Sequence, residues 1–299
     1  MFKIDEVEEF YSSAVLPRYG ETQRANIDKE LVHLRKATRK LANKHLLPWI
    51  VLIDEGIHFL HFLGLLIASR DKKGSVQFTL MSLIAKLQSL AISFRELIIL
   101  GQSDSSRLIL RGFIETSDLA QVALSDSEFC NKYFPDTEIA DDYDYNFWKS
   151  SIAYGRIYKL VEDAMQKAGY SDSEIKNHIT WKKGLKAHLS GAVHTDSSSA
   201  QQSCLIPSLT KRGTLVYFSL GHLSAYSPML CNHLINDLLI FSGVFKGLIG
   251  STDMPKHLKG FKSGVEYACT IASCETIREF HNRFNKELNI PFEELSPQK

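Results

Sequence analysis

The 299-residue chain lacks the sequence motifs of several common enzyme folds. It has no G-x-x-x-x-G-K-[ST] segment, no G-x-G-x-x-G after a candidate strand and no G-x-S-x-G. Ser190-Gly191 has no strand–turn–helix setting that would make it a nucleophile elbow. These absences exclude nucleotide hydrolysis by a P-loop and the chemistry of the α/β-hydrolases.

Cysteine is scarce and irregularly spaced. There are five cysteines and no C-x-x-C motif, which indicates free thiols in a reducing cytoplasm instead of a disulfide framework or a zinc knuckle. The first ten residues, MFKIDEVEEF, are acidic and contain no apolar core of the kind found in a secretory signal. We therefore expect a cytoplasmic protein.

Excess charge of either sign is also missing, because the net charge is only +1. The chain as a whole therefore has no general attraction to nucleic acids or anionic membranes, and any basic site must be local. The most apolar stretch, Leu46–Ala68, contains Asp54, Glu55, His58 and His61. A membrane span rarely carries four ionisable groups, so we interpret this stretch as a buried helix and expect no membrane partner.

Helical periodicity and capping residues predict an all-α fold, a bundle of about eight helices within a single domain, 1–299. It would comprise a basic N-terminal extension (1–45), a central bundle (46–200) and C-terminal helices (201–299). Gly213–Leu220 is the only segment that we predict as a strand. The expected helices are Arg24–Lys44, Pro48–Ser69, Val76–Leu100, Ser103–Leu124, Tyr145–Ala168, Ser171–Ser190, Ser227–Leu248 and Lys262–Leu288.

A charged stripe follows one face of the expected helix Ser103–Leu124. Arg107, Arg111 and Glu115 lie at i, i+4 and i+8, and Asp118 lies close by. On a largely apolar helix such a stripe is partly buried, and a buried arginine needs a partner such as Glu115. One interpretation is an exposed ion pair; the other is an arginine that holds a buried polar network or contacts a phosphate.

A second group of polar residues stands near the expected end of the helix Ser171–Ser190. His194 follows Gly191, where a histidine can bond to the last helix carbonyls. Alternatively, it acts as a general acid or base on a phosphodiester. Lys182, Lys183 and Lys186 lie upstream on the same helix. They form either a solvated face or a nucleic-acid-binding site that guides a phosphate backbone.

Two segments carry a resemblance to a known class of proteins. Arg111-Gly-Phe-Ile-Glu115 and Leu189-Ser190-Gly-Ala-Val-His194, within residues 76–200, resemble uncharacterised bacterial all-helical proteins with a distant tie to the HEPN class (higher eukaryotes and prokaryotes nucleotide-binding). The resemblance implies a HEPN-like core and a metal-independent ribonuclease of a toxin or antiphage system, completed by dimerisation. HEPN proteins carry Arg, four to six residues, then His; no arginine stands at that spacing before His194.

Two further patterns suggest other functions. Glu30-x-x-His33 and Glu55-x-x-His58 have the spacing of carboxylate–histidine metal ligands in helical bundles. Arg18–His45 holds eight Lys or Arg against three acidic residues, and it suits nucleic-acid binding through Arg35 and Arg39 or contact with a protein partner or a second copy.

Together these patterns favour a nucleic-acid-directed effector that acts on RNA without a cofactor. In this interpretation His194 is the acid or base, Arg111 binds the phosphate or holds the structure, and Glu115 orients Arg111. The alternatives are a non-enzymatic helical assembly module and a carboxylate–histidine metal protein.

Overall fold

The computed structural model describes residues 5–6, 9, 11–15, 17, 21–69, 74–135, 143–194, 205–210, 215–217 and 222–284. Helices dominate these ranges, so the predicted all-α class is confirmed. The first half contains η1 (Tyr11–Val15), α3 (Glu21–His45), α4 (Leu47–Ala68), α5 (Ser75–Ile99), α6 (Ser103–Ser125) and α7 (Ser127–Tyr133). The second half contains α8 (Tyr143–Phe147), η2 (Trp148–Ile152), η3 (Ala153–Gly155), α9 (Arg156–Lys167), α10 (Asp172–His194), α12 (Ser227–Gly250), η4 (Lys256–Phe261) and α13 (Val265–Arg283).

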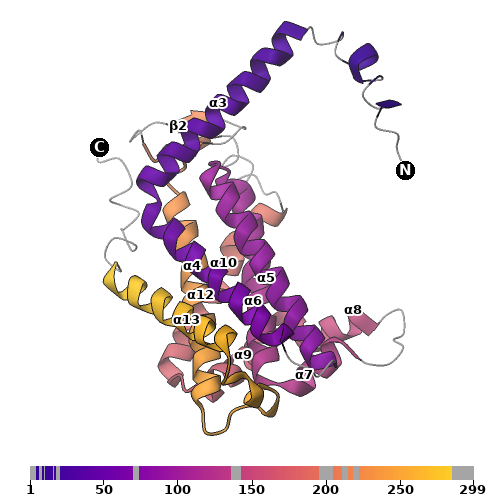
Figure 1. Ribbon diagram of the computed structural model, residues 1–299, viewed down its shortest axis with the longest axis vertical. Coiled ribbons are helices and arrows are strands. Elements are labelled where there is room, and N and C mark those ends of the chain that lie inside the picture. Colours follow the sequence, from indigo (N-terminus) through magenta and orange to yellow (C-terminus); the bar gives the residue numbers. More distant parts are fainter. Residues whose placement is uncertain are drawn as a thin grey trace.

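One hydrophobic core joins the central and C-terminal parts of the chain. α5 packs against α4 and α6, α12 packs against α4 and α6, and α13 lies along α4 (Figure 1). Phe59 of α4 meets Phe241 of α12 edge to face, with ring centroids 5.7 Å apart. Residues on both sides of position 200 therefore contribute to this core.

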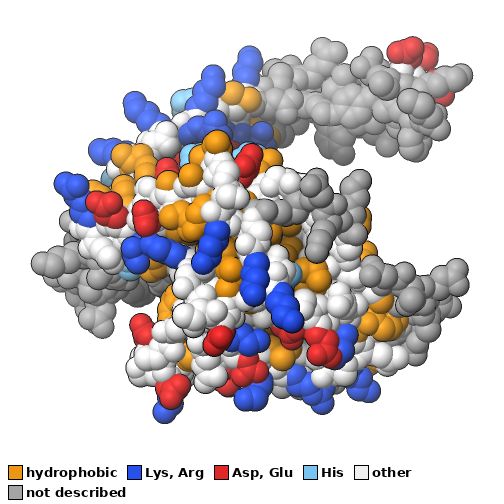
Figure 2. Space-filling view, turned by 60° about the horizontal axis from the view of Figure 1, so that its bottom comes forward, with side chains coloured by type: hydrophobic (Ala, Val, Ile, Leu, Met, Phe, Trp, Pro, Cys, Tyr) orange, Lys and Arg blue, Asp and Glu red, His pale blue; other side chains and the backbone are white. Residues whose placement is uncertain are grey.

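The first long helix reaches beyond this core. α3 rises above the other helices at one end of the molecule (Figure 1). Near its C-terminal end, Thr38 and Ala42 are buried against the bundle. From Lys29 onward its Lys and Arg side chains, including Arg35 and Arg39, are exposed. Lys and Arg side chains gather along the edge of the molecule where α3 lies (Figure 2).

The turn between α5 and α6 requires glycine. Gly101 adopts φ +72°, and a Cβ there would lie 2.6 Å from the carbonyl carbon of His222. The backbone of His222 also donates a hydrogen bond to the Gly101 carbonyl, at 3.0 Å. Only glycine accepts this backbone conformation at such close approach. The contact fixes the start of α6 against the segment that precedes α12.

Two predicted helix boundaries are wrong. The helix expected over Tyr145–Ala168 is broken into α8, η2, η3 and α9, because Ala153 is extended and Gly155 takes φ +81°. α10 continues through Gly191 to His194, since a helix tolerates an interior glycine at a cost of about 1 kcal/mol. His194 is thus in the last turn of α10 and not beyond it.

The strand prediction is confirmed over a short length. Leu215–Tyr217 (β2) pairs in antiparallel register with Leu205–Pro207 (β1). No other sheet occurs in the ranges that the structure describes. The hairpin leaves the helical class of the fold unchanged.

Three helices are long and apolar enough, by length and composition, to cross a membrane. They are α4, α5 and α12. In the structure, half of the most apolar window of α4 is buried against neighbouring helices, and the buried share for α12 is 56%. The expectation that the protein has no membrane partner stays a prediction.

Candidate functional site

A buried ionic cluster joins α6, α10 and α12. Lys182 of α10 forms an ion pair with Asp118 of α6, and its Nζ lies 2.8 Å from Oδ1 of Asp237 in α12. All three residues are fully buried. Lys186, one turn further along α10, lies with its Nζ 2.6 Å from Oδ2 of Asp118. We call Asp118, Lys182, Lys186 and Asp237 the ionic cluster.

The two aspartates of the ionic cluster differ electrostatically. Burial raises the pKa of Asp118, but the ammonium groups of Lys182 and Lys186 outweigh it and bring the pKa below its ordinary value. Asp237 has a single lysine partner, so burial dominates and its pKa is raised. Burial lowers the pKa of Lys182, and the two carboxylates more than offset this and keep it raised. Because its pKa is lowered, Asp118 stays ionised between the two lysine ammonium groups.

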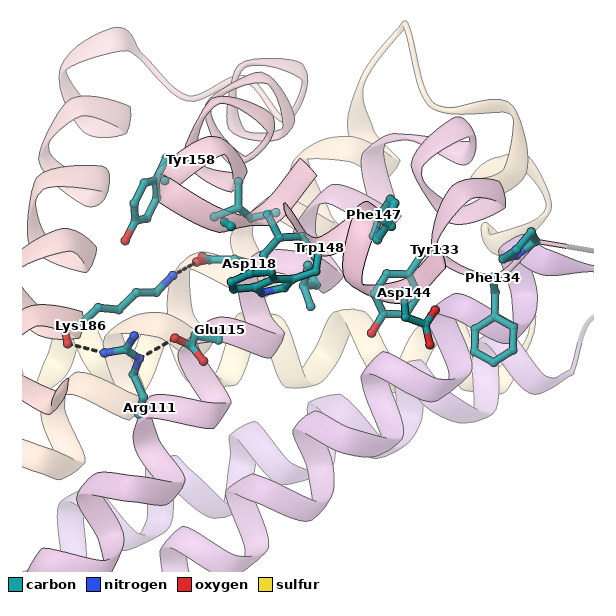
Figure 3. A pocket seen from close by; sticks show the side chains of 16 residues that line it. Arg111, Glu115, Asp118, Tyr133, Phe134, Asp144, Phe147, Trp148, Tyr158 and Lys186 are labelled. Carbon is teal, nitrogen blue, oxygen red and sulfur yellow. Dashed lines mark hydrogen bonds and ion pairs between the residues drawn. The ribbon is translucent and has the colours of Figure 1, made fainter. Parts of the chain in front are cut away.

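Arg111 connects α6 to α10 beside the ionic cluster. Its Nε donates to the carboxylate of Glu115, and its Nη1 donates to the backbone carbonyl of Lys186 (Figure 3). Nη1 also donates to Oγ of Ser190, at 2.8 Å. Nη2 of Arg111 has no hydrogen-bond partner among the residues described here. The predicted polar stripe is thus a bridge between two helices, and its arginine keeps unused donors.

A cavity of about 770 Å³ opens next to this bridge. Arg111, Glu115, Asp118 and Lys186 line one end of it. Five aromatic side chains line the rest, namely Tyr133, Phe134, Phe147, Trp148 and Tyr158 (Figure 3). Lys186 also lies over the Tyr158 ring, with Nζ 4.8 Å from the centroid. The cavity therefore combines a cationic end with an aromatic wall.

The two segments of the HEPN resemblance meet in the structure at Arg111 and Ser190. Arg107 contacts the carbonyl of His188 at 3.4 Å, while Asp118 pairs with Lys182, so α6 and α10 run antiparallel. His194 therefore lies toward the N-terminal end of α6, and its Cα is about 6 Å along the helix axis from that of Ser190. The side chain of His194 lies outside the described part of the chain.

The predicted nucleic-acid-binding lysines and arginines have different surroundings. Lys182 is fully buried in the ionic cluster, which corrects its expected place on a solvated, phosphate-binding face. Lys183 is exposed, and its Nζ lies 5.1 Å from the Tyr158 ring centroid. Arg35 is exposed on α3, and Arg39 is paired with Glu96 at 3.1 Å. Of these residues, Lys186 lines the same cavity as Arg111, and Lys183 shares the Tyr158 ring with Lys186.

The sequence did not predict that Asp237 belongs to the ionic cluster. It also did not predict that two histidines lie beside Trp181 of α10. The rings of His178 and His233 both lie near Trp181, with centroids 5.5 and 6.0 Å from that of the indole. Burial lowers the pKa of His178 to about 3 and that of His233 to about 4, so both are neutral core residues. The sequence signal for Asp237 was a lone acid in the apolar stretch Leu230–Phe241.

The candidate metal ligands do not assemble into a site. Glu55 and His58 pair with each other at 3.6 Å. Asp54 pairs instead with Arg95 of α5. In the described ranges, no group of three or more His, Cys, Asp or Glu side chains is placed to hold a metal ion. The metal-protein alternative therefore gains no support from the fold.

Comparisons of the chain with protein-family models, with curated proteins and with solved structures found no match.

Proposed function

We propose that this protein is a nucleic-acid-directed effector that binds RNA where α6 meets α10 and cleaves it without a metal ion. The observation that carries the proposal is the position of Arg111 and Lys186 together at one end of an aromatic-lined cavity. The proposal includes the HEPN-like core and the toxin or antiphage role that the resemblance implies, and the cytoplasmic location expected from the unpaired cysteines.

The N–H donors beside Arg111 can bind an anionic ligand. Glu115 orients the guanidinium through Nε, and Nη2 remains able to donate to a phosphate oxygen. Lys186 is held on Asp118 and keeps further N–H donors of its ammonium. Exposed Lys183 adds a third cation at the same edge of α10. Fixed donors of this kind stabilise the charge of a pentavalent phosphate because they need no reorganisation during the reaction.

His194 supplies the proton transfer in this proposal. As a base it removes the proton of a ribose 2′-hydroxyl, whose oxygen attacks the adjacent phosphorus while the 5′-oxygen leaves. The leaving oxygen takes up the proton that His194 removed, so the products are a 2′,3′-cyclic phosphate and a 5′-hydroxyl and His194 returns to its neutral form. Ser190, one helical turn before His194, is the residue that Arg111 contacts, and this supports a shared phosphate.

Cleavage of a single-stranded RNA in the presence of EDTA tests the proposal. We expect the wild type to produce cyclic-phosphate ends, and His194→Ala to lose about 100-fold or more of the rate with its melting temperature retained. Glu115→Gln is expected to reduce cleavage less, because Arg111 keeps its bonds to α10. Absence of cleavage by the wild type across diverse RNAs would contradict the proposal.

A second candidate function is helical assembly through α3. This helix extends beyond the core and exposes Val32 (52%) among the basic side chains of Lys29, Arg35 and Lys36. An exposed apolar residue within a basic helix face is compatible with a protein partner that carries acidic side chains, or with a second copy.

A further inference from the structure

Exposed aromatic side chains gather around one cavity. Trp148 and Phe134 line it and are 47% and 49% exposed. Large aromatic groups are normally buried in a soluble protein, so a cluster exposed at a cavity marks a binding surface. Trp148 also begins a π-helical turn, a local distortion that is frequent at functional sites.

The aromatic wall and the cationic end belong to the same cavity. Trp148 stands between the Arg111–Lys186 end and the Tyr133–Phe134 end (Figure 3). Asp118 is neutralised there by two lysines, and Glu115 by Arg111. Arg111 and Lys186 keep N–H donors beyond these ion pairs, so a ligand can place a planar apolar face on the ring wall while an anionic group accepts hydrogen bonds from Arg111 and Lys186.

A second hollow of about 730 Å³ continues past Phe147, which lines both. Its other lining residues include three cations, Lys132, Lys149 and Arg156. A path with cations on both sides of an aromatic wall matches a polyanion that carries planar groups between its charges. A single strand of nucleic acid has this pattern, because its bases are free to stack on aromatic side chains.

We infer that the cavity is a base-binding subsite for one unpaired nucleotide of a single-stranded nucleic acid, with the base on Trp148 and its phosphate on Arg111 and Lys186. The inference deepens the proposed function, on which it rests for the identity of the polymer. It adds a selectivity, since a paired base inside a duplex cannot enter the cavity. The volume of about 770 Å³ falls within the range of about 300 to 1,000 Å³ of small-molecule sites and accommodates a nucleotide.

Asp144 gives the subsite a means of reading the base. It lines the cavity, and its carboxylate is near the Tyr133 phenol, whose pKa is raised by burial and by Asp144. In Figure 3 it lies on the Tyr133–Phe134 side, away from Arg111. A carboxylate accepts hydrogen bonds only, so it favours bases with an amino or imino N–H on the edge that faces it.

Direct binding with the full chain tests the subsite without any turnover. Fluorescence anisotropy would compare a labelled 12-nucleotide RNA strand with the same sequence as a duplex, and unlabelled nucleoside 5′-monophosphate, nucleoside and inorganic phosphate would compete. We expect the strand to bind at least tenfold more tightly than the duplex. The monophosphate should compete better than the nucleoside or phosphate, because only it engages both ends of the cavity.

Trp148→Ala should weaken strand binding by about 5- to 150-fold, the equivalent of one lost base stack of about 1–3 kcal/mol. Phe78→Ala, at a similarly exposed aromatic residue on α5 outside the cavity, should leave it unchanged. Equal binding of strand and duplex, competition by phosphate as strong as by the monophosphate, or an unaffected Trp148→Ala would each overturn the inference.

Three further outcomes identify the ligand source and separate this inference from the proposed function. A monophosphate that binds as tightly as the strand would support the cavity as a nucleotide site but assign it to a free nucleotide. Strand binding that depends on Trp148 in a protein that does not cleave RNA would support the subsite and contradict the ribonuclease. RNA cleavage that is unaffected by Trp148→Ala would support the ribonuclease and contradict the base-binding subsite.

Discussion

Replacing Lys182 with methionine tests the ionic cluster most severely. The side chain is fully buried and is the ion-pair partner of both Asp118 and Asp237. Removing one partner of a buried ion pair costs about 3–5 kcal/mol, because the remaining charge is left in a low-dielectric interior. Unfolding entropy of about 2.1 cal/mol/K per residue gives about 0.6 kcal/mol/K for 299 residues. We therefore expect Lys182→Met to lower Tm by about 5–8 °C near pH 7.

The pH dependence of this loss has a definite sign. Without Lys182, burial raises the folded-state pKa of both aspartates above the unfolded value of about 3.9. A group with a raised folded pKa contributes stability below its unfolded pKa and loses it as pH rises through the folded pKa. The deficit of Lys182→Met against the wild type should thus be largest near pH 7–8 and shrink toward pH 4–5.

Calorimetry or chemical denaturation across this pH range measures the deficit. Lys183→Met, at the exposed neighbour on the same helix, is the matched control and should change the unfolding free energy by less than about 0.5 kcal/mol. Lys182→Met/Asp237→Asn should regain part of the loss, because one buried charge is removed. A loss equal to that of Lys183→Met, or a deficit that grows toward low pH, would refute the account of the cluster.

Two other predictions concern close packing and assembly. Gly247→Ala should destabilise the fold by about 1–3 kcal/mol in thermal unfolding, because a Cβ there overlaps the carbonyl oxygen of Ala168. Gly184 on α10 has open space around it, so the control Gly184→Ala should be neutral or stabilising by up to about 1 kcal/mol. Arg35→Glu should shift the oligomeric state in sedimentation analysis if α3 mediates assembly; an unchanged state, equal to that of an Arg156→Glu control, would speak against it.

Local features of the fold could be predicted from the sequence. The Ser171–Glu174 capping box is formed as expected, with the Ser171 backbone N–H donating to the Glu174 carboxylate at 2.8 Å and the Glu174 N–H donating to Ser171 Oγ at 3.4 Å. The long helices α4, α5, α6 and α12 begin within about two residues of their predicted starts. These features depend on neighbours in the sequence, which is why periodicity and capping patterns predict them.

The site depends on partners that are distant in sequence. Asp118 and Asp237 meet Lys182 across 64 and 55 residues, and no spacing rule links positions on three different helices. Lys182 was therefore interpreted as a surface residue, although it is fully buried. The aromatic wall was also missed, because Tyr133, Trp148 and Tyr158 come from separate short elements around the break at Gly155. The Arg111–Glu115 pair was predictable because its two members are one helical turn apart.

The most direct test of the proposed function is cleavage of single-stranded RNA in EDTA by the wild type, Arg111→Ala and His194→Ala. The account predicts 2′,3′-cyclic-phosphate products from the wild type, and a rate at least 100-fold lower for both variants, with His194→Ala still binding the RNA. Cleavage that persists unchanged in both variants, or RNA left intact by the wild type, would contradict the assignment of this site to an RNA-directed effector.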